Sequence, residues 1–193
     1  MNIPDYLQAL FPAPYIVLGV KLKRFSVGDY TILRSVDSPF LDESRHQDAD
    51  YDDLLFAFAV CTSKDYDEAD ALVGDYHASK KYAEEMEGIL IQQSEKLNLR
   101  ESIDTMQEYI DKGFKIPLYS IQSNDTVKES GTFWLQSVIL TLTSELGYTR
   151  QEVFNTPMSQ AISDYLWQLE KNGSVRILPE YLIKMIKESK EKQ

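Results

Sequence analysis

The sequence has little of the residues on which many kinds of protein site depend. Its single cysteine, Cys61, excludes an internal disulfide and a cysteine-rich zinc site. Its two histidines, His46 and His77, are too few for a catalytic zinc site with three ligands unless acidic residues supply the remainder. No apolar run approaches the roughly 20 residues that span a bilayer, and no secretion signal is present. We therefore expect a cytoplasmic protein that does not enter a membrane.

Positive charge is also scarce. The chain of 193 residues carries 20 Lys and Arg against 31 Asp and Glu, which gives a net charge of −11 and a pI near 4.6. Binding to nucleic acid needs clustered basic residues, so the composition argues against a nucleic-acid partner. Most of the excess lies between Asp42 and Asp75, where eleven acids face only Arg45 and Lys64.

This acidic stretch contains two clusters of carboxylates on either side of the apolar run 54–61. The run is suited to a buried helix, and acids ahead of it favour the positive end of the helix dipole. We expect the first cluster to start that helix and the second to form a solvated connector. The first comprises Asp48, Asp50, Asp52 and Asp53, and the second Asp65, Asp67, Glu68 and Asp70.

The remaining signals are mostly those of short helices with well-marked ends. Residues 15–22 are β-branched and partly alternating, which predicts a short strand or extended segment. Ser26 followed by Asp29 resembles a capping box and predicts a helix that Pro39 ends. Residues 79–112 predict two helices with a break near Asn98, where Glu101 completes a capping signal.

Residues 113–125 contain proline, serine and asparagine, and predict a loop and the best domain boundary. Further helices are expected over 133–146, 149–154 and 156–171 and from residue 178 onward. The predicted fold is mainly α, with a short extended or β segment near the N-terminus. We expect a division into residues 1–120 and 121–193, with a single domain as the alternative.

No motif for catalysis, metal binding or cofactor binding survives a detailed comparison. The alternating acids from Asp48 resemble a calcium loop, but the sixth and twelfth positions hold Asp53 and Ala59 instead of glycine and glutamate. No G-x-S-x-G elbow and no phosphate-binding glycine cluster occurs. We therefore predict no catalytic, metal-binding or cofactor-binding residues and no enzymatic activity, with a carboxylate-bound metalloenzyme as a minor alternative.

Residues that bind a protein partner are a more promising class. Trp167 lies off the apolar stripe of its helix, and such aromatic residues are enriched at interfaces. Packing of Trp167 against a neighbouring helix is the alternative. The apolar face of residues 79–112 is a second candidate, because an exposed helix face can dock a partner helix. Its predicted contact residues are Tyr82, Met86 and Leu90.

Both ends of the chain resemble one family of proteins. In residues 137–166 a helix ends in Leu146-Gly147-Tyr148, a capped turn follows, and Thr156-Pro157-Met158 begins the next helix. This pattern is similar to that of the tail assembly chaperones and related tail-module proteins of tailed phages and prophages. Residues 18–29 are similar to the family's opening, an extended segment followed by a capped helix. The resemblance covers about 60 residues and does not include the centre of the chain.

The resemblance implies a protein of the host bacterial cytoplasm that is not an enzyme. It would bind the tape-measure protein or another tail component and keep it soluble during assembly, and a homo-oligomer is left open. One alternative is a structural virion component, either a head–tail connector or a minor tail protein. Another is an acidic adaptor or regulator that binds a basic partner.

Overall fold

The computed structural model describes residues 15–42, 45, 48–49, 51–74, 99–122, 133–179 and 181–183. The fold is mainly helical with a short two-stranded hairpin near the N-terminus, which confirms the predicted class. The described residues fall into two compact units. Unit 1 contains residues 115–149 and 159–183, and unit 2 contains residues 15–114 and 150–158, within the described ranges. The predicted division at residue 120 was linear along the chain, whereas these units interleave.

Unit 2 begins with an antiparallel hairpin. Strand β1 (Tyr15–Val17) pairs with β2 (Val20–Leu22), with Val17 opposite Val20. Leu18 and Gly19 connect them with φ of 52° and 77°. Positive φ at both positions is what a two-residue hairpin turn of type I′ requires, and glycine adopts it readily. The expected extended segment is therefore a hairpin.

Helix α2 (Val27–Ser35) begins at the predicted capping box. The Ser26 hydroxyl accepts a hydrogen bond from the Asp29 amide, and the Asp29 carboxylate accepts one from the Ser26 amide. These bonds satisfy two amides, one of which the start of a helix would otherwise leave without a partner. The helix is followed by a short 3₁₀ turn, η1 (Pro39–Leu41), which agrees with the expected stop at Pro39.

Helix α3 (Tyr51–Thr62) contains the apolar run and is buried over most of its length. Helix α4 (Tyr66–Gly74) follows after three residues. The second acidic cluster was therefore wrongly predicted to be a connector: Asp67, Glu68 and Asp70 lie in α4, and Asp65 precedes it. The Asp65 carboxylate accepts a hydrogen bond of 3.1 Å from the Glu68 amide, so this cluster caps a helix.

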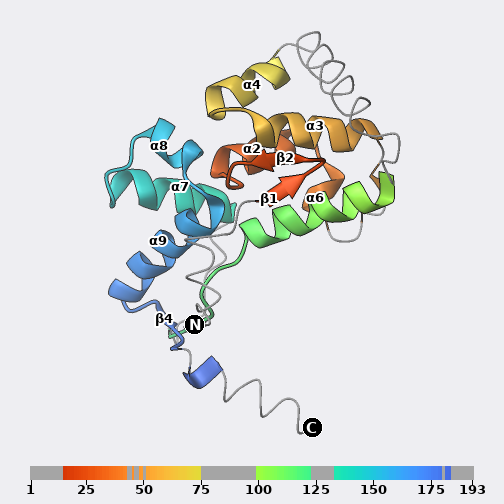
Figure 1. Cartoon of the computed structure of the whole chain (residues 1–193). Coiled ribbons are helices and arrows are strands. Elements are labelled where there is room, and N and C mark those ends of the chain that lie inside the picture. Colours follow the sequence, from red (N-terminus) through yellow and green to blue (C-terminus); the bar gives the residue numbers. More distant parts are fainter. Residues whose placement is uncertain are drawn as a thin grey trace, which may run out of the picture. The chain divides into compact units, whose positions relative to one another are not determined.

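Helix α6 (Leu99–Gly113) completes unit 2 and contacts both α3 and β1 (Figure 1). Its start at Leu99 agrees with the signal predicted near Asn98. Ile103, Met106 and Ile110 are buried along one face. Aromatic rings from α2, α6 and the segment before α2 pack edge to face or tilted against one another, namely Phe25, Tyr30, Tyr109 and Phe114.

Helix α8 (Arg150–Asn155) belongs to unit 2, whereas α7 (Trp134–Ser144) belongs to unit 1. Gly147, with φ of 76°, follows α7 in the predicted place. Helix α9 (Met158–Lys171) lies in unit 1 apart from its first residue and is followed by Gly173, also with φ of 76°. The predicted helices over 133–146, 149–154 and 156–171 are thus confirmed.

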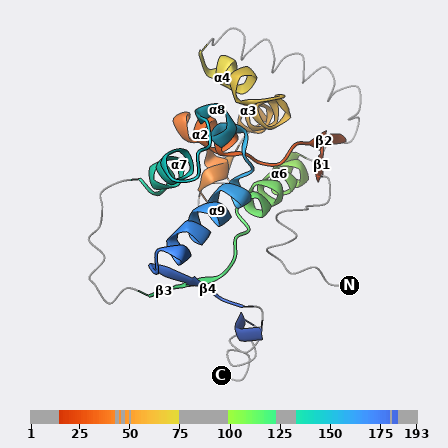
Figure 2. The same ribbon diagram turned by 90° about the vertical axis from the view of Figure 1, so that its left-hand side faces the viewer.

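Unit 1 also contains strands that the sequence reading missed. Strand β3 (Tyr119–Ile121) pairs antiparallel with β4 (Val175–Ile177), with Ser120 opposite Arg176 (Figure 2). The predicted loop over 113–125 therefore contains a strand. The error arose because the partner strand lies more than fifty residues away, so no local hairpin pattern announces it.

Candidate functional site

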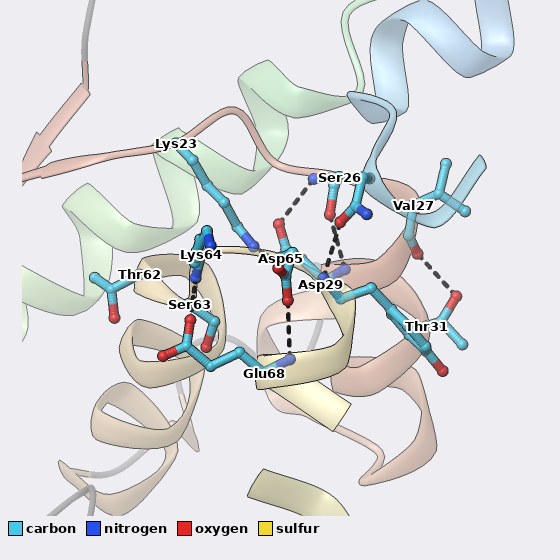
Figure 3. Close-up of polar contacts among 12 residues, drawn as sticks. Lys23, Ser26, Val27, Asp29, Thr31, Thr62, Ser63, Lys64, Asp65 and Glu68 are labelled. Atoms are coloured by element: carbon cyan, nitrogen blue, oxygen red, sulfur yellow. Dashed lines mark hydrogen bonds and ion pairs between the residues drawn. The ribbon is translucent and has the colours of Figure 1, made fainter. Parts of the chain in front are cut away.

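Two features of the described residues merit examination as functional sites. The first is a buried polar cluster in unit 2, at the start of α2 (Figure 3). The Lys23 ammonium lies 2.9 Å from Oδ1 of Asp29, whose side chain is fully buried, while that of Lys23 is 26% exposed. The Ser26 amide donates to the other carboxylate oxygen at 2.9 Å. Burial raises the pKa of the Asp29 carboxyl, although Lys23 and the Ser26 bonds act in the opposite direction.

Cys61 of α3 and Tyr109 of α6 lie in the same buried region. The Tyr109 hydroxyl donates a hydrogen bond of 3.1 Å to the backbone carbonyl of Lys23. Burial raises the pKa of the Cys61 thiol well above its usual range, and the Asp29 charge acts in the same direction. Burial likewise raises the pKa of the Tyr109 phenol. A thiol held in its neutral form is a poor nucleophile and a poor metal ligand.

These contacts make the cluster a structural feature of unit 2. Asp29 connects the segment between β2 and α2 to the helix itself, and Tyr109 connects α6 to the same segment. No group of three or more His, Cys, Asp or Glu side chains among the described residues is placed to hold a metal ion. Nor does any helix of that part of the chain have the length and apolarity to cross a lipid bilayer.

The second feature is the uneven distribution of exposed large apolar side chains. Unit 2, with 80 described residues, exposes four of them, whereas the 49 described residues of unit 1 expose nine. Exposed apolar residues scattered singly are normal, but a concentration of them marks an interaction surface. The nine residues of this apolar set are Leu118, Tyr119, Ile121, Phe133, Trp134, Leu140, Leu146, Trp167 and Tyr181.

Helix α7 contributes most clearly to this set. Like α3, it is strongly apolar, and none of its eleven residues is charged. Seven of the twelve residues of α3 are buried, but only Leu135, Val138 and Leu142 are buried in α7. Leu140 is 53% exposed on the opposite side of that helix. An uncharged helix with an apolar exposed face is typical of a protein-binding surface.

Helix α9 carries the predicted contact residue Trp167, whose side chain is 62% exposed. The alternative, packing of this indole against a neighbouring helix, does not agree with that exposure. Two side-chain hydrogen bonds connect α9 with the end of α7: Tyr148 donates to Asp164 at 2.9 Å, and Gln168 donates to Glu145. Burial raises the pKa of the Asp164 carboxyl, while the Tyr148 bond lowers it. The exposed residues of α7 and α9 thus belong to one connected framework.

Charge is divided between the units in the opposite way. The described residues of unit 1 contain three basic and three acidic side chains and have no net charge. Those of unit 2 contain nine basic and fifteen acidic side chains, a net charge of −6. The described part of the protein therefore has one acidic unit with few exposed apolar side chains and one neutral unit with many.

The structure brings only part of the predicted contact set into view. Trp167 lies in unit 1, while Tyr82, Met86 and Leu90 lie outside the described residues, so their proposed role stays a prediction. Sequence reasoning missed Tyr119 and Ile121, because Pro117 and Ser120 favoured a loop. Their alternation around Ser120, apolar, polar, apolar, was the available signal.

Comparison with protein-family models, with curated proteins and with solved structures finds no match to this chain. Any functional argument therefore depends on the residues themselves and on the resemblance described from the sequence.

Proposed function

We propose that this chain is a non-enzymatic tail-module protein of a tailed phage or prophage. It acts in the host cytoplasm as an assembly chaperone that binds the tape-measure protein, or another tail protein, through the apolar set of unit 1. The observation that carries the proposal is the concentration of exposed apolar side chains in a neutral unit, beside an acidic remainder. The resemblance of residues 18–29 and 137–166 to tail-module proteins supplies the choice of client.

The apolar set supports the client-binding part of this proposal. A tape-measure protein is long and helical and carries apolar faces, which are insoluble until they are covered. Burial of one large apolar side chain contributes roughly 1.5–3 kcal/mol, so a few such residues suffice for micromolar affinity. Trp167 and Leu140 are the strongest candidates, because tryptophan dominates interface energies and Leu140 lies on an uncharged helix.

The charge of the chain supports the solubilising part. A net charge of −11 makes loaded complexes repel one another, and this repulsion opposes aggregation of the client. In unit 2 the acids of α4 lie exposed to solvent, as this role requires. The same charge disfavours binding to nucleic acid, so a protein client suits it better.

A pull-down tests the proposal directly. The full chain is tagged and expressed together with the tail proteins encoded beside its gene, and retained proteins are identified. We expect the tape-measure protein or another tail protein to be retained. The double variant Leu140→Ser/Trp167→Ala should bind at least about tenfold more weakly, because it truncates two exposed apolar contacts.

The matched control is Ile16→Ser in unit 2. Ile16 is also 62% exposed, so this variant removes an apolar side chain of similar exposure from the other unit. Binding should be unchanged. Retention of no tail protein would contradict the function, and equal loss in both variants would contradict the assignment to unit 1. Mass spectrometry of purified virions then separates a chaperone, which should be absent, from a structural component.

A further inference from the structure

The two edges of the β3–β4 ribbon differ in their unpaired backbone groups. Leu178 donates to the carbonyl of Leu118 at 2.8 Å, and Gln122 donates to that of Ser174 at 3.0 Å. In an antiparallel ladder such bonded pairs occur at alternate residues, so the even-numbered residues of β3 face β4. The N–H and C=O groups of Tyr119 and Ile121 therefore point away from β4, along the outer edge of β3.

The outer edge of β4 is partly closed. The Glu170 carboxylate, from the end of α9, accepts a hydrogen bond of 2.8 Å from the outward amide of Ile177. Covering an edge with a charged side chain is a common way to prevent strand addition. For the outward groups of Tyr119 and Ile121, no such bond is found within the part of the chain that the structure describes. The β3 edge is thus the open one.

The side chains at this open edge are apolar. Ile121 is 64% exposed and Tyr119 is 44% exposed, and both lie on the ribbon face that carries Val175 and Ile177. The other face carries Ser120 and Arg176. An edge strand that is both unpaired and apolar on one face is a template for a further strand.

We propose that the β3 edge binds the same edge of a second copy of this chain, which forms a four-stranded antiparallel sheet across a two-fold axis through Ser120. The inference does not depend on the proposed function.

The register of such a pairing is self-consistent. With Ser120 opposite its own copy, Tyr119 lies opposite Ile121 of the second copy, and each of these residues already points its backbone groups outward. Four backbone hydrogen bonds form. The aromatic and β-branched side chains meet as a favourable cross-strand pair, repeated by symmetry. A one-residue shift would instead place residues whose backbone groups face β4 at the edge, and no ladder would form.

Charge favours a second copy as the occupant of this edge. Two chains of net charge −11 repel each other, so they can meet only where the local charge is low. The described part of unit 1 has no net charge, and residues 116–122 contain no charged side chain. The two Arg176 side chains would be separated by both β3 strands, on the face opposite the apolar pairs.

Sedimentation of the full chain across a wide range of concentrations tests the proposal. We expect a reversible dimer for the natural chain. Ile121→Pro removes one outward N–H per chain without removing a bond to β4, so it should weaken dimerisation roughly thirtyfold or more. Ile121→Thr keeps the N–H and the strand preference, and serves as the matched control with a smaller effect.

A disulfide test reads the register and does not depend on how well the proline variant folds. At a two-fold axis the Ser120 Cα atoms form a non-hydrogen-bonded pair about 4.5 Å apart, which suits a disulfide. Ser120→Cys should therefore give a covalent dimer on mild oxidation. Gln122→Cys, whose copies would lie about 14 Å apart, should not.

Three results would overturn the proposal: a chain that stays monomeric at every concentration, a dimer unaffected by Ile121→Pro, or equal cross-linking of the two cysteine variants. A monomer whose Ile121→Pro variant loses a tail protein would assign the edge to another protein.

Discussion

The side-chain oxygen of Asn155 accepts a hydrogen bond of 2.8 Å from the backbone amide of Tyr66, although 89 residues separate them. Asn155 ends α8 and Tyr66 begins α4, so one helix caps the other. The Tyr66 ring also stacks on Phe154, with ring centroids 4.4 Å apart. This junction connects the acidic α4 to the C-terminal part of unit 2.

Asn155→Ala should destabilise unit 2 by roughly 0.5–1.5 kcal/mol, because the Tyr66 amide loses its acceptor. Hydrogen exchange at the Tyr66 amide should become faster by the corresponding factor. The control is Gln151→Ala on the same helix, since Gln151 makes only a long exposed contact of 3.5 Å to Asp67. Equal effects of the two variants on stability and exchange would contradict this account of the junction.

Gly28→Ala should also destabilise unit 2, by about 1–3 kcal/mol, despite the better helix propensity of alanine. An added Cβ would lie 2.6 Å from Cδ2 of Tyr66 and 2.8 Å from the carbonyl oxygen of Phe154, and the latter is backbone. Denaturant unfolding measures the effect. Arg34→Ala, on the exposed part of the same helix, should change stability by less than about 0.5 kcal/mol. A Gly28→Ala protein as stable as the natural one would contradict the close packing at this site.

Lys23→Met should destabilise the protein by about 1–3 kcal/mol at neutral pH, because it leaves the buried Asp29 carboxylate without its cation. The pKa of Asp29 is raised above its ordinary value of 3.8, so the folded state binds this proton more readily than the unfolded state. Stability from this group is therefore present below the ordinary pKa and lost as pH rises through the raised one.

In the Lys23→Met protein the pKa of Asp29 should rise further. The difference in unfolding free energy from the natural chain should consequently narrow as pH falls and Asp29 becomes protonated. The Asp29→Asn background provides the control: in it, Lys23→Met should show no such narrowing. Unfolding curves at several pH values measure both. A difference that stays constant with pH in the Asp29 background would contradict the ion pair.

Cys61 should not react with thiol reagents in the folded protein, because its side chain is fully buried and burial raises the pKa of the thiol. It should react fully in denaturant. A Ser144→Cys variant, which places a second thiol on the exposed side of α7, should react with one equivalent under native conditions. Rapid native labelling of Cys61 itself would show that α3 is not buried as described.

The sequence predicted the elements whose determinants are local. The Ser26–Asp29 capping box, the helix end at Gly147 and the buried run of α3 all depend on residues within a few positions of one another. The exposure of Trp167 followed from its place off the helical stripe.

Features that depend on distant residues were not predictable. Strand β3 exists because β4 pairs with it, and the residues of β3 taken alone resemble a loop. Asp29 was identified as a capping residue, but its ion pair with Lys23 depends on how the preceding segment folds back. The acids near Asp65 resembled a connector because the Asn155 cap of α4 lies far along the chain.

The solubility of the tape-measure protein tests the central claim most directly. This protein is expressed alone, with the natural chain, with Leu140→Ser/Trp167→Ala and with Ile16→Ser, and its amount in the cleared lysate is measured. The account predicts a soluble tape-measure protein with the natural chain and with Ile16→Ser, and an aggregated one alone or with the double variant. An equal soluble amount in all four samples would contradict it.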